Sequence, residues 1–198
     1  MKESKSNIIF NYTHTGYDAL NLIKVEKGAS KISLDNNIIN IISSSESFAS
    51  IKAISLDSSE DVEISNNQIN IESLDSIVYG IYSLEDRNLS ILNNHISINS
   101  YNTGRGIYLS KVNNSNVKNN NIVSNSIGDA SNSYAVEAYN LNNISFSGNF
   151  INSTSRVQSY GLSIFRGAGL SIDSNEIHLC ATGALAIDLY GDDDSPAS

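Results

Sequence analysis

The stretch LSIDSNEIHL (residues 170–179) contains two short runs of alternating apolar residues that are joined across an asparagine. Leu170 and Ile172 form the first run, and the second run begins at Ile177, after Asn175. Alternation with a period of two is typical of a β-strand with one buried face, and asparagine tolerates the backbone of a tight bend. The stretch therefore predicts two strands that are connected by a sharp corner.

The same pattern occurs six times along the chain. The other copies are ISLDNNIINI (32–41), VEISNNQINI (62–71), LSILNNHISI (89–98), SNVKNNNIVS (115–124) and ISFSGNFINS (144–153). Their shared asparagines are separated by 26 to 30 residues and are Asn37, Asn67, Asn94, Asn120, Asn149 and Asn175. Self-similarity at a regular period of this length is typical of a solenoid, in which each repeat packs on its neighbours.

A second repeated element precedes the last five copies at a constant distance, so that Ile81, for example, is eight residues before Leu89. Its members are AISL (53–56), GIYS (80–83), GIYL (106–109), AVEA (135–138) and GLSI (161–164), and we expect ALNL (19–22) and ALAI (184–187) to be the first and last members. The second residue of each member should face inward, and the small residue before it should border a shallow channel. Each turn is therefore predicted to hold three short strands, with two fixed corners and one variable loop.

The spacing L-x-I-x-x-N-x-I also fits a leucine-rich repeat, which would form a horseshoe instead of a β-helix. A leucine-rich repeat follows its asparagine with a helical or irregular segment. Here the alternation continues after the asparagine, and the GIY-type segments add a third β-branched strand. No segment has a helical period and length. These features favour a parallel β-helix.

The repeated G-I-Y-x and x-S-I-x-x-N-x-I segments resemble those of the right-handed parallel β-helix, or pectate-lyase-like, superfamily over nearly the whole chain. The resemblance implies an all-β solenoid of about seven coils, each of three short strands. It also implies that Asn37 through Asn175 form a stacked ladder in the bend between the second and third strands, where amides hydrogen-bond along the axis. We expect Asn94 and Asn120 to adopt special backbone conformations in this bend.

The ends of the chain both fall in the middle of a predicted coil. NIIFN (7–11) fits the end of the first copy with Ile9 over Ile39, and the last coil stops after its first strand. The chain shows neither the basic start and apolar run of a signal peptide nor a stretch long enough to span a membrane. We therefore expect residues 1–198 to be one β-helix segment excised from a longer extracellular or bacterial cell-surface protein, whose signal and anchor lie outside it.

Composition narrows the possible partners and cofactors. The net charge of −9, the pI near 4.6 and the lack of a basic run argue against binding to nucleic acid or to an anionic membrane. A single cysteine, Cys180, excludes an internal disulfide and multi-cysteine zinc sites. We expect His14, His95 and His178 on different sides of the coil, and the acidic run GDDD (191–194) to be solvated. The sequence therefore predicts no metal and no cofactor.

The ten tyrosines gather on or beside the predicted first strands, which makes one side of the solenoid aromatic. Tyr82 and Tyr108 should point outward from adjacent coils and form a strip, because a tyrosine ring offers an apolar face and a hydrogen-bonding tip. Glu137 and Ser163 continue the same outward column, and Arg105 lies nearby. We therefore expect a ligand-binding face formed by Tyr82, Tyr108, Glu137, Ser163 and Arg105.

An enzyme would need carboxylates on that face, and the candidate catalytic residues are Glu137 and Asp188. Asp188 follows two coils after Glu137 but falls one position beyond the outward column, and an isolated outward acid is more often a solubilising residue. The superfamily includes polysaccharide lyases and hydrolases, phage tailspikes and the passenger domains of bacterial autotransporters. The chain lacks the clustered aspartates of polygalacturonases and the calcium carboxylates and paired arginine of pectate lyases.

We therefore favour a non-catalytic segment, similar to an autotransporter passenger or another bacterial adhesin. It would present an elongated face to a glycan or protein of a host cell or matrix, without inserting into a membrane. The alternative is a polysaccharide lyase or glycoside hydrolase that acts in a groove along the first-strand face.

Overall fold

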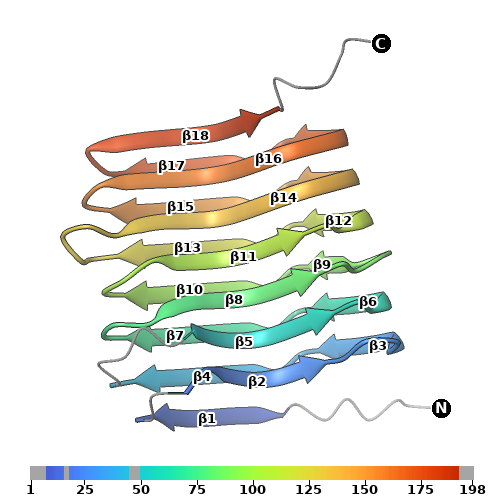
Figure 1. The fold of residues 1–198 in the computed structure, drawn as a ribbon, viewed down its shortest axis with the longest axis horizontal. Coiled ribbons are helices and arrows are strands. Elements are labelled where there is room, and N and C mark those ends of the chain that lie inside the picture. Colours follow the sequence, from blue (N-terminus) through green and yellow to red (C-terminus); the bar gives the residue numbers. More distant parts are fainter. Residues whose placement is uncertain (1–7, 16–17, 45–49, 192–198) are drawn as a thin grey trace.

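The chain forms a parallel β-helix in the computed structural model, which describes residues 8–15, 18–44 and 50–191 (Figure 1). Every strand pairing in these ranges is parallel. Six coils are complete, and β1 (Ile9–His14) and β18 (Gly183–Tyr190) add a partial coil at either end. The predicted fold is confirmed, with about six coils instead of about seven.

The strands stack in three columns, named here first, second and third by their order within a coil. The first strands are β2 (Leu20–Val25), β5 (Ser50–Asp57), β8 (Ile77–Leu84), β11 (Gly104–Ser110), the beginnings of β14 (Asn132–Ser147) and β16 (Gln158–Asp173), and β18. The second strands are β3 (Ser30–Asp35), β6 (Glu60–Ser65), β9 (Ser90–Leu92), β12 (Asn113–Lys118) and the ends of β14 and β16. The third strands are β1, β4 (Ile38–Ser43), β7 (Gln68–Ser73), β10 (His95–Ser100), β13 (Asn121–Ser126), β15 (Phe150–Ser155) and β17 (Glu176–Cys180).

The corner between the first and second strands changes along the solenoid. In the first four complete coils the strand ends at this corner and a new strand begins after it. β14 and β16 instead continue through the corner as strands of 16 residues each. The first and second columns therefore merge into one 11-stranded sheet, and the third column forms a separate 7-stranded sheet. The prediction of three short strands per coil holds for the early coils and fails for these last two complete ones.

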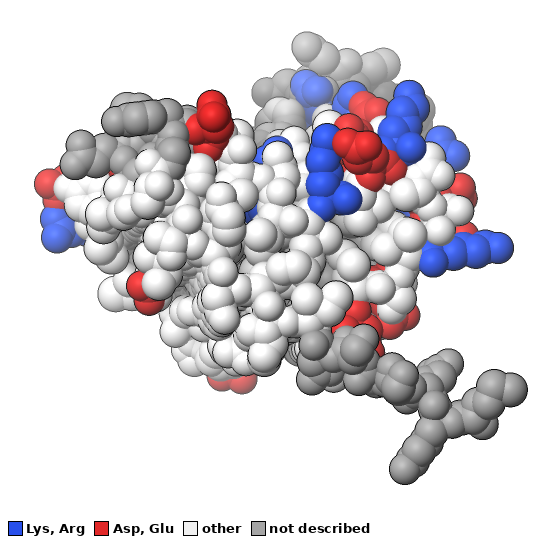
Figure 2. Space-filling model, turned by 90° about the horizontal axis from the view of Figure 1, so that it is seen from below, with Lys and Arg blue, Asp and Glu red and all other residues white. Residues whose placement is uncertain are grey.

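Stacked aliphatic side chains fill the interior. The third strands contribute a column of isoleucines in register, each fully buried, namely Ile39, Ile69, Ile96, Ile122 and Ile151. Figure 2 looks along the axis from the first coil and shows an uncharged middle, with Lys and Arg interleaved with Asp and Glu at the rim. Because each coil repeats the same side chains about 4.8 Å further on, the core is a set of continuous apolar columns.

The register of the first coil differs from the expected one. Phe10, rather than Ile9, pairs with Ile39. In β2 the residue that pairs with Ile54 is Ile23 instead of Leu20. The segment ALNLI (19–23) contains three large aliphatic residues at mixed spacing, so its alternation fits more than one register, and pairing with β5 decides between them.

The last coil is also shifted, by two residues. Ile187, rather than Leu185, pairs with Leu162, and Asp188 therefore pairs with Ser163. Asp188 thus lies in the outward column itself, and the expectation that it falls one position beyond this column is wrong. The cause is again an ambiguous run, because ALAI (184–187) can alternate in either of two registers.

From β5 to β16 the small residues that precede the inward residues are buried and do not border an outer channel. Gly106 is buried, and a Cβ atom on it would lie 2.4 Å from Cγ2 of Ile122 and 2.6 Å from the carbonyl oxygen of Ala135. Two consecutive inward positions, such as Gly80 and Ile81, bring the outward residues on either side of them together. The ring centroids of Tyr79 and Tyr82 are accordingly 5.3 Å apart.

The asparagine ladder is present in all six coils, from Asn37 to Asn175. Nδ2 of Asn94 donates to Oδ1 of Asn120 (3.0 Å) and to the carbonyl oxygen of Ile64 (2.8 Å). The backbone N–H of Asn94 donates to the same Oδ1 at 2.9 Å. The Asn94 side chain therefore links the coil before it to the coil after it inside a buried bend.

The unusual backbone conformation lies one residue before each ladder asparagine. Asn93 and Asn119 have φ of 55° and 56°, whereas Asn94 and Asn120 do not have a positive φ. The expectation that the ladder residues themselves adopt a special conformation is therefore wrong. The preceding residue makes the turn, and this leaves the ladder side chain free to point into the bend.

Candidate functional site

Three rows of side chains run along the outward face of the first strands. Row A consists of Lys52, Tyr79, Arg105, Tyr134 and Tyr160. Row B consists of Ser55, Tyr82, Tyr108, Glu137, Ser163 and Asp188. Row C consists of Asp57, Leu84, Ser110, Tyr139, Phe165 and Tyr190. Chemically distinctive side chains from six coils therefore share one face.

Tyr82 and Tyr108 lie in adjacent coils of row B, and their rings stack on each other. The ring centroids are 5.0 Å apart and the planes differ by 8°. Nζ of Lys52 lies 3.6 Å from the centroid of the Tyr82 ring, and Tyr79 meets both rings edge-on. Because these contacts occupy the ring faces, the half-buried pair offers mainly ring edges and hydroxyls to solvent.

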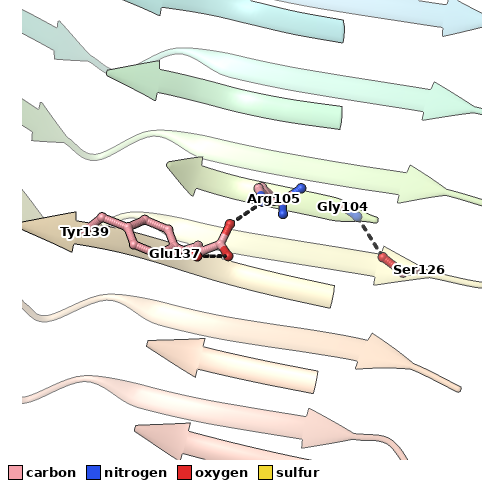
Figure 3. Close-up of polar contacts among 5 residues, drawn as sticks. All are labelled: Gly104, Arg105, Ser126, Glu137 and Tyr139. Atoms are coloured by element: carbon pink, nitrogen blue, oxygen red, sulfur yellow. Dashed lines mark hydrogen bonds and ion pairs between the residues drawn. The ribbon is translucent and has the colours of Figure 1, made fainter. Parts of the chain in front are cut away.

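Arg105 and Glu137 form a covered ion pair in the middle of this face (Figure 3). Nε of Arg105 donates to one carboxylate oxygen of Glu137, and the hydroxyl of Tyr139 donates to the other at 2.8 Å. The Arg105 guanidinium lies 5.3 Å from the ring centroids of both Tyr79 and Tyr134. Glu137 is 5 % exposed, so the expectation of a solvated, solubilising acid at this position is wrong.

The backbone beside Arg105 is fixed by a contact to the third column. The N–H of Gly104 donates to Oγ of Ser126 at 2.9 Å, at the start of β11 (Figure 3). Arg105 itself is largely enclosed, with 17 % of its side chain exposed. The arginine is therefore placed to hold Glu137 and is poorly placed to contact a ligand directly.

A hollow of about 190 Å³ opens next to Glu137, towards the last coils. We call it the carboxylate hollow, and its lining residues are Tyr134, Glu137, Ala138, Tyr139, Tyr160, Ser163, Phe165, Asp188 and Tyr190. The rings of row C are tilted here, with Tyr139 and Phe165 at 6.0 Å and 48°, and Phe165 and Tyr190 at 6.2 Å and 33°. These rings are tilted and not stacked face to face, which leaves ring surface available to a ligand.

The structure divides the expected site residues into two groups. Glu137, Ser163 and Asp188 line the carboxylate hollow together, whereas Tyr82 and Tyr108 lie towards earlier coils. Row C was missed by the sequence analysis, although it leaves a trace in the sequence. An aromatic residue stands two positions after each outward residue in EAY (137–139), SIF (163–165) and DLY (188–190).

The tyrosines on this face should resist ionisation in the folded protein. Burial is the largest cause that raises the pKa of Tyr79, Tyr82, Tyr108, Tyr134, Tyr139 and Tyr160. Each of these tyrosines has a higher pKa in the folded protein than its unfolded value of about 10. This difference favours the folded state below about pH 10, and its contribution to stability is lost as the pH rises through the folded-state pKa. We expect an absorbance titration to show fewer than ten tyrosines ionising near pH 10, the rest ionising as the β signal in circular dichroism is lost. Ionisation of all ten with an unchanged β signal would contradict this.

The three histidines share one sheet but lie far apart, so the expectation that they occupy different sides is wrong. His14, His95 and His178 lie on β1, β10 and β17, and successive members of this set are three strands apart in the third column. At about 4.8 Å per strand this separation is about 14 Å, far longer than a metal–nitrogen bond.

Cys180 is exposed on β17, and GDDD (191–194) lies outside the described residues except for Gly191. No helix in the described ranges has the length and apolar character needed to cross a membrane.

A family model described as "Periplasmic copper-binding protein (NosD)" matches residues 2–184 of the chain. No curated protein and no solved structure matches it significantly. The copper named in that description does not fit the donors of this chain as far as the structure describes them. Across residues 8–15, 18–44 and 50–191, no three side chains of His, Cys, Asp or Glu converge on a point where a metal ion could be held.

Proposed function

This chain belongs to the NosD family of right-handed parallel β-helix proteins, and we propose that it is a non-catalytic, adhesin-like glycan-binding protein. The ligand is an extended glycan of a cell surface or matrix, and it lies along rows A to C. The word "periplasmic" in the family description supports a location outside the cytoplasm. The polar exterior and the net charge of −9 suit such an environment and disfavour nucleic acid.

The observation that carries the proposal is the carboxylate hollow and its position in a long aromatic face. Five rings, two carboxylates and a serine hydroxyl surround it, and rows A and B continue from it along the axis. Ring faces pack against the apolar face of a sugar, and carboxylates and hydroxyls bond its hydroxyl groups. A hollow of about 190 Å³ on an open face suits one sugar unit of a longer chain.

A glycoside hydrolase is the second candidate, because two carboxylates line the same hollow. Glu137 and Asp188 are two strands apart in row B, or about 9.6 Å along the axis, which is compatible with an inverting pair. Against this role, both oxygens of Glu137 already accept hydrogen bonds from Arg105 and Tyr139. With both oxygens occupied and only 5 % of the residue exposed, Glu137 is poorly placed to reach a scissile bond. We therefore retain binding without catalysis.

The proposal is tested by screening the protein on a glycan array and replacing one exposed ring of the hollow. Tyr190 is 58 % exposed, so Tyr190→Ala should leave stability nearly unchanged. It should weaken the binding of an array-identified glycan by about 1 to 3 kcal/mol, measured by calorimetry. Tyr101, 49 % exposed and outside the hollow, gives the matched control Tyr101→Ala, which should bind normally.

Equal binding by both tyrosine variants would place the ligand elsewhere and overturn the proposed site. The absence of catalysis is tested on the same glycan with a reducing-end release assay. We expect no release by the wild type. Release that disappears in Glu137→Gln or Asp188→Asn would establish the hydrolase instead.

A further inference from the structure

The aromatic face contains cations of its own in the early coils. Nζ of Lys52 lies 3.6 Å from the Tyr82 ring centroid, and the Arg105 guanidinium lies between Tyr79 and Tyr134. Both contacts are within the distance of a favourable cation–π interaction, because the electron-rich face of a ring attracts positive charge. Over these coils the chain itself supplies the positive partner of its tyrosines.

The carboxylate hollow repeats this arrangement without the cation. Its rings and carboxylates come from the same three rows, and none of its lining residues is lysine or arginine. Arg166 packs over the Phe165 ring at 4.9 Å, but it lines a neighbouring hollow instead of this one. The rings of Tyr139 and Tyr190 therefore line a hollow whose lining contains no positive side chain of the described residues.

The two carboxylates of the hollow differ in their charge balance. Glu137 is neutralised by Arg105, whereas Asp188 has no ion pair among the described residues. Asp188 is half-buried, so its charge acts in an environment less polar than water. One uncompensated negative charge is thus left beside several aromatic rings, in a chain whose net charge is −9.

From this arrangement we infer that the hollow binds a protonated amine, and that the glycan carries amino sugars whose amino groups are not acetylated. The ammonium group pairs with the Asp188 carboxylate, and the ring of Tyr190, two residues further along β18 and in the same hollow, lies beside its positive charge. N-acetylation removes that charge and enlarges the substituent, so it removes the preference. The inference rests on the proposed function, since it specifies the sugar that the same face binds.

The test compares three oligosaccharides of equal length by calorimetry: a fully deacetylated glucosamine oligomer, its N-acetylated form and a neutral glucose oligomer. The pH is one at which amines are protonated and ordinary carboxyl groups are ionised. The wild type should bind the deacetylated oligomer about tenfold more tightly than either of the others. Asp188→Asn should abolish this preference, while Asp173→Asn, an exposed site on the end of β16, should retain it.

The outcomes separate the two proposals. Equal affinity for all three oligomers, or a preference that survives Asp188→Asn, overturns the amine inference and leaves glycan binding in place. A preference that Asp173→Asn removes as fully as Asp188→Asn also overturns it, because general negative charge would then explain the effect. If the protein binds none of the three oligomers and nothing on a glycan array, the proposed function itself fails.

Discussion

Asn120→Leu is expected to destabilise the protein by about 3 to 5 kcal/mol. Oδ1 of Asn120 accepts hydrogen bonds from the backbone N–H and the side-chain amide of Asn94, and Nδ2 donates to the carbonyl oxygen of Ile91. Leucine can replace none of these bonds. The substitution leaves the backbone N–H of Asn94 and the carbonyl of Ile91 without these partners, and each such loss destabilises the folded state by about 1 to 3 kcal/mol.

The measurement is urea unfolding followed by circular dichroism, with Asn125→Leu as the matched control. Asn125 lies in the same coil on the outer face, where its amide makes one exposed hydrogen bond to Asn99. The control should cost less than about 1 kcal/mol, because water replaces the lost partner. Similar losses for the two variants would show that stacking within the bend contributes little to stability.

Ile107→Ala is expected to cost about 2 to 5 kcal/mol, because it opens a cavity in a continuous apolar column. Ile107 is fully buried and pairs with Ile81 in the coil before it and Val136 in the coil after it. The rigid stacking of coils prevents the backbone from collapsing into the space. Ile127→Ala, at a side chain that is 58 % exposed, should change stability by less than about 0.5 kcal/mol.

Tyr108→Ala, measured in the same unfolding series, separates core packing from the outer face. Tyr108 is half-buried and stacked on Tyr82, so its loss should cost about 1 kcal/mol, more than an isolated surface ring and less than Ile107. A loss as large as that of Ile107→Ala would mean that the row B rings act as core residues and contribute chiefly to folding.

The candidate site was predictable in part. Glu137 and Ser163 could be placed on one face because outward positions follow from alternation within each strand, whereas Asp188 joins them only through the register in which β18 pairs with β16. The state of Glu137 could not be foreseen, since its partners are 32 residues earlier, at Arg105, and two residues later, at Tyr139. An acid with the same outward position is solvated or enclosed according to the side chains that neighbouring coils place beside it.

The parallel β-helix, its asparagine corners and its aromatic side could all be predicted from the amino-acid sequence alone. The corners recur in every complete coil and aromatic residues in four successive ones from β8 to β16, so a local pattern is sufficient to specify them. The tertiary structure alone decided the register of the first and last coils, where ALNLI and ALAI alternate equally well in two ways and pairing with β5 and β16 selects one. It also decided which rings enclose the carboxylate hollow, because contacts between coils depend on side-chain packing across 25 or more residues, and no local pattern encodes them.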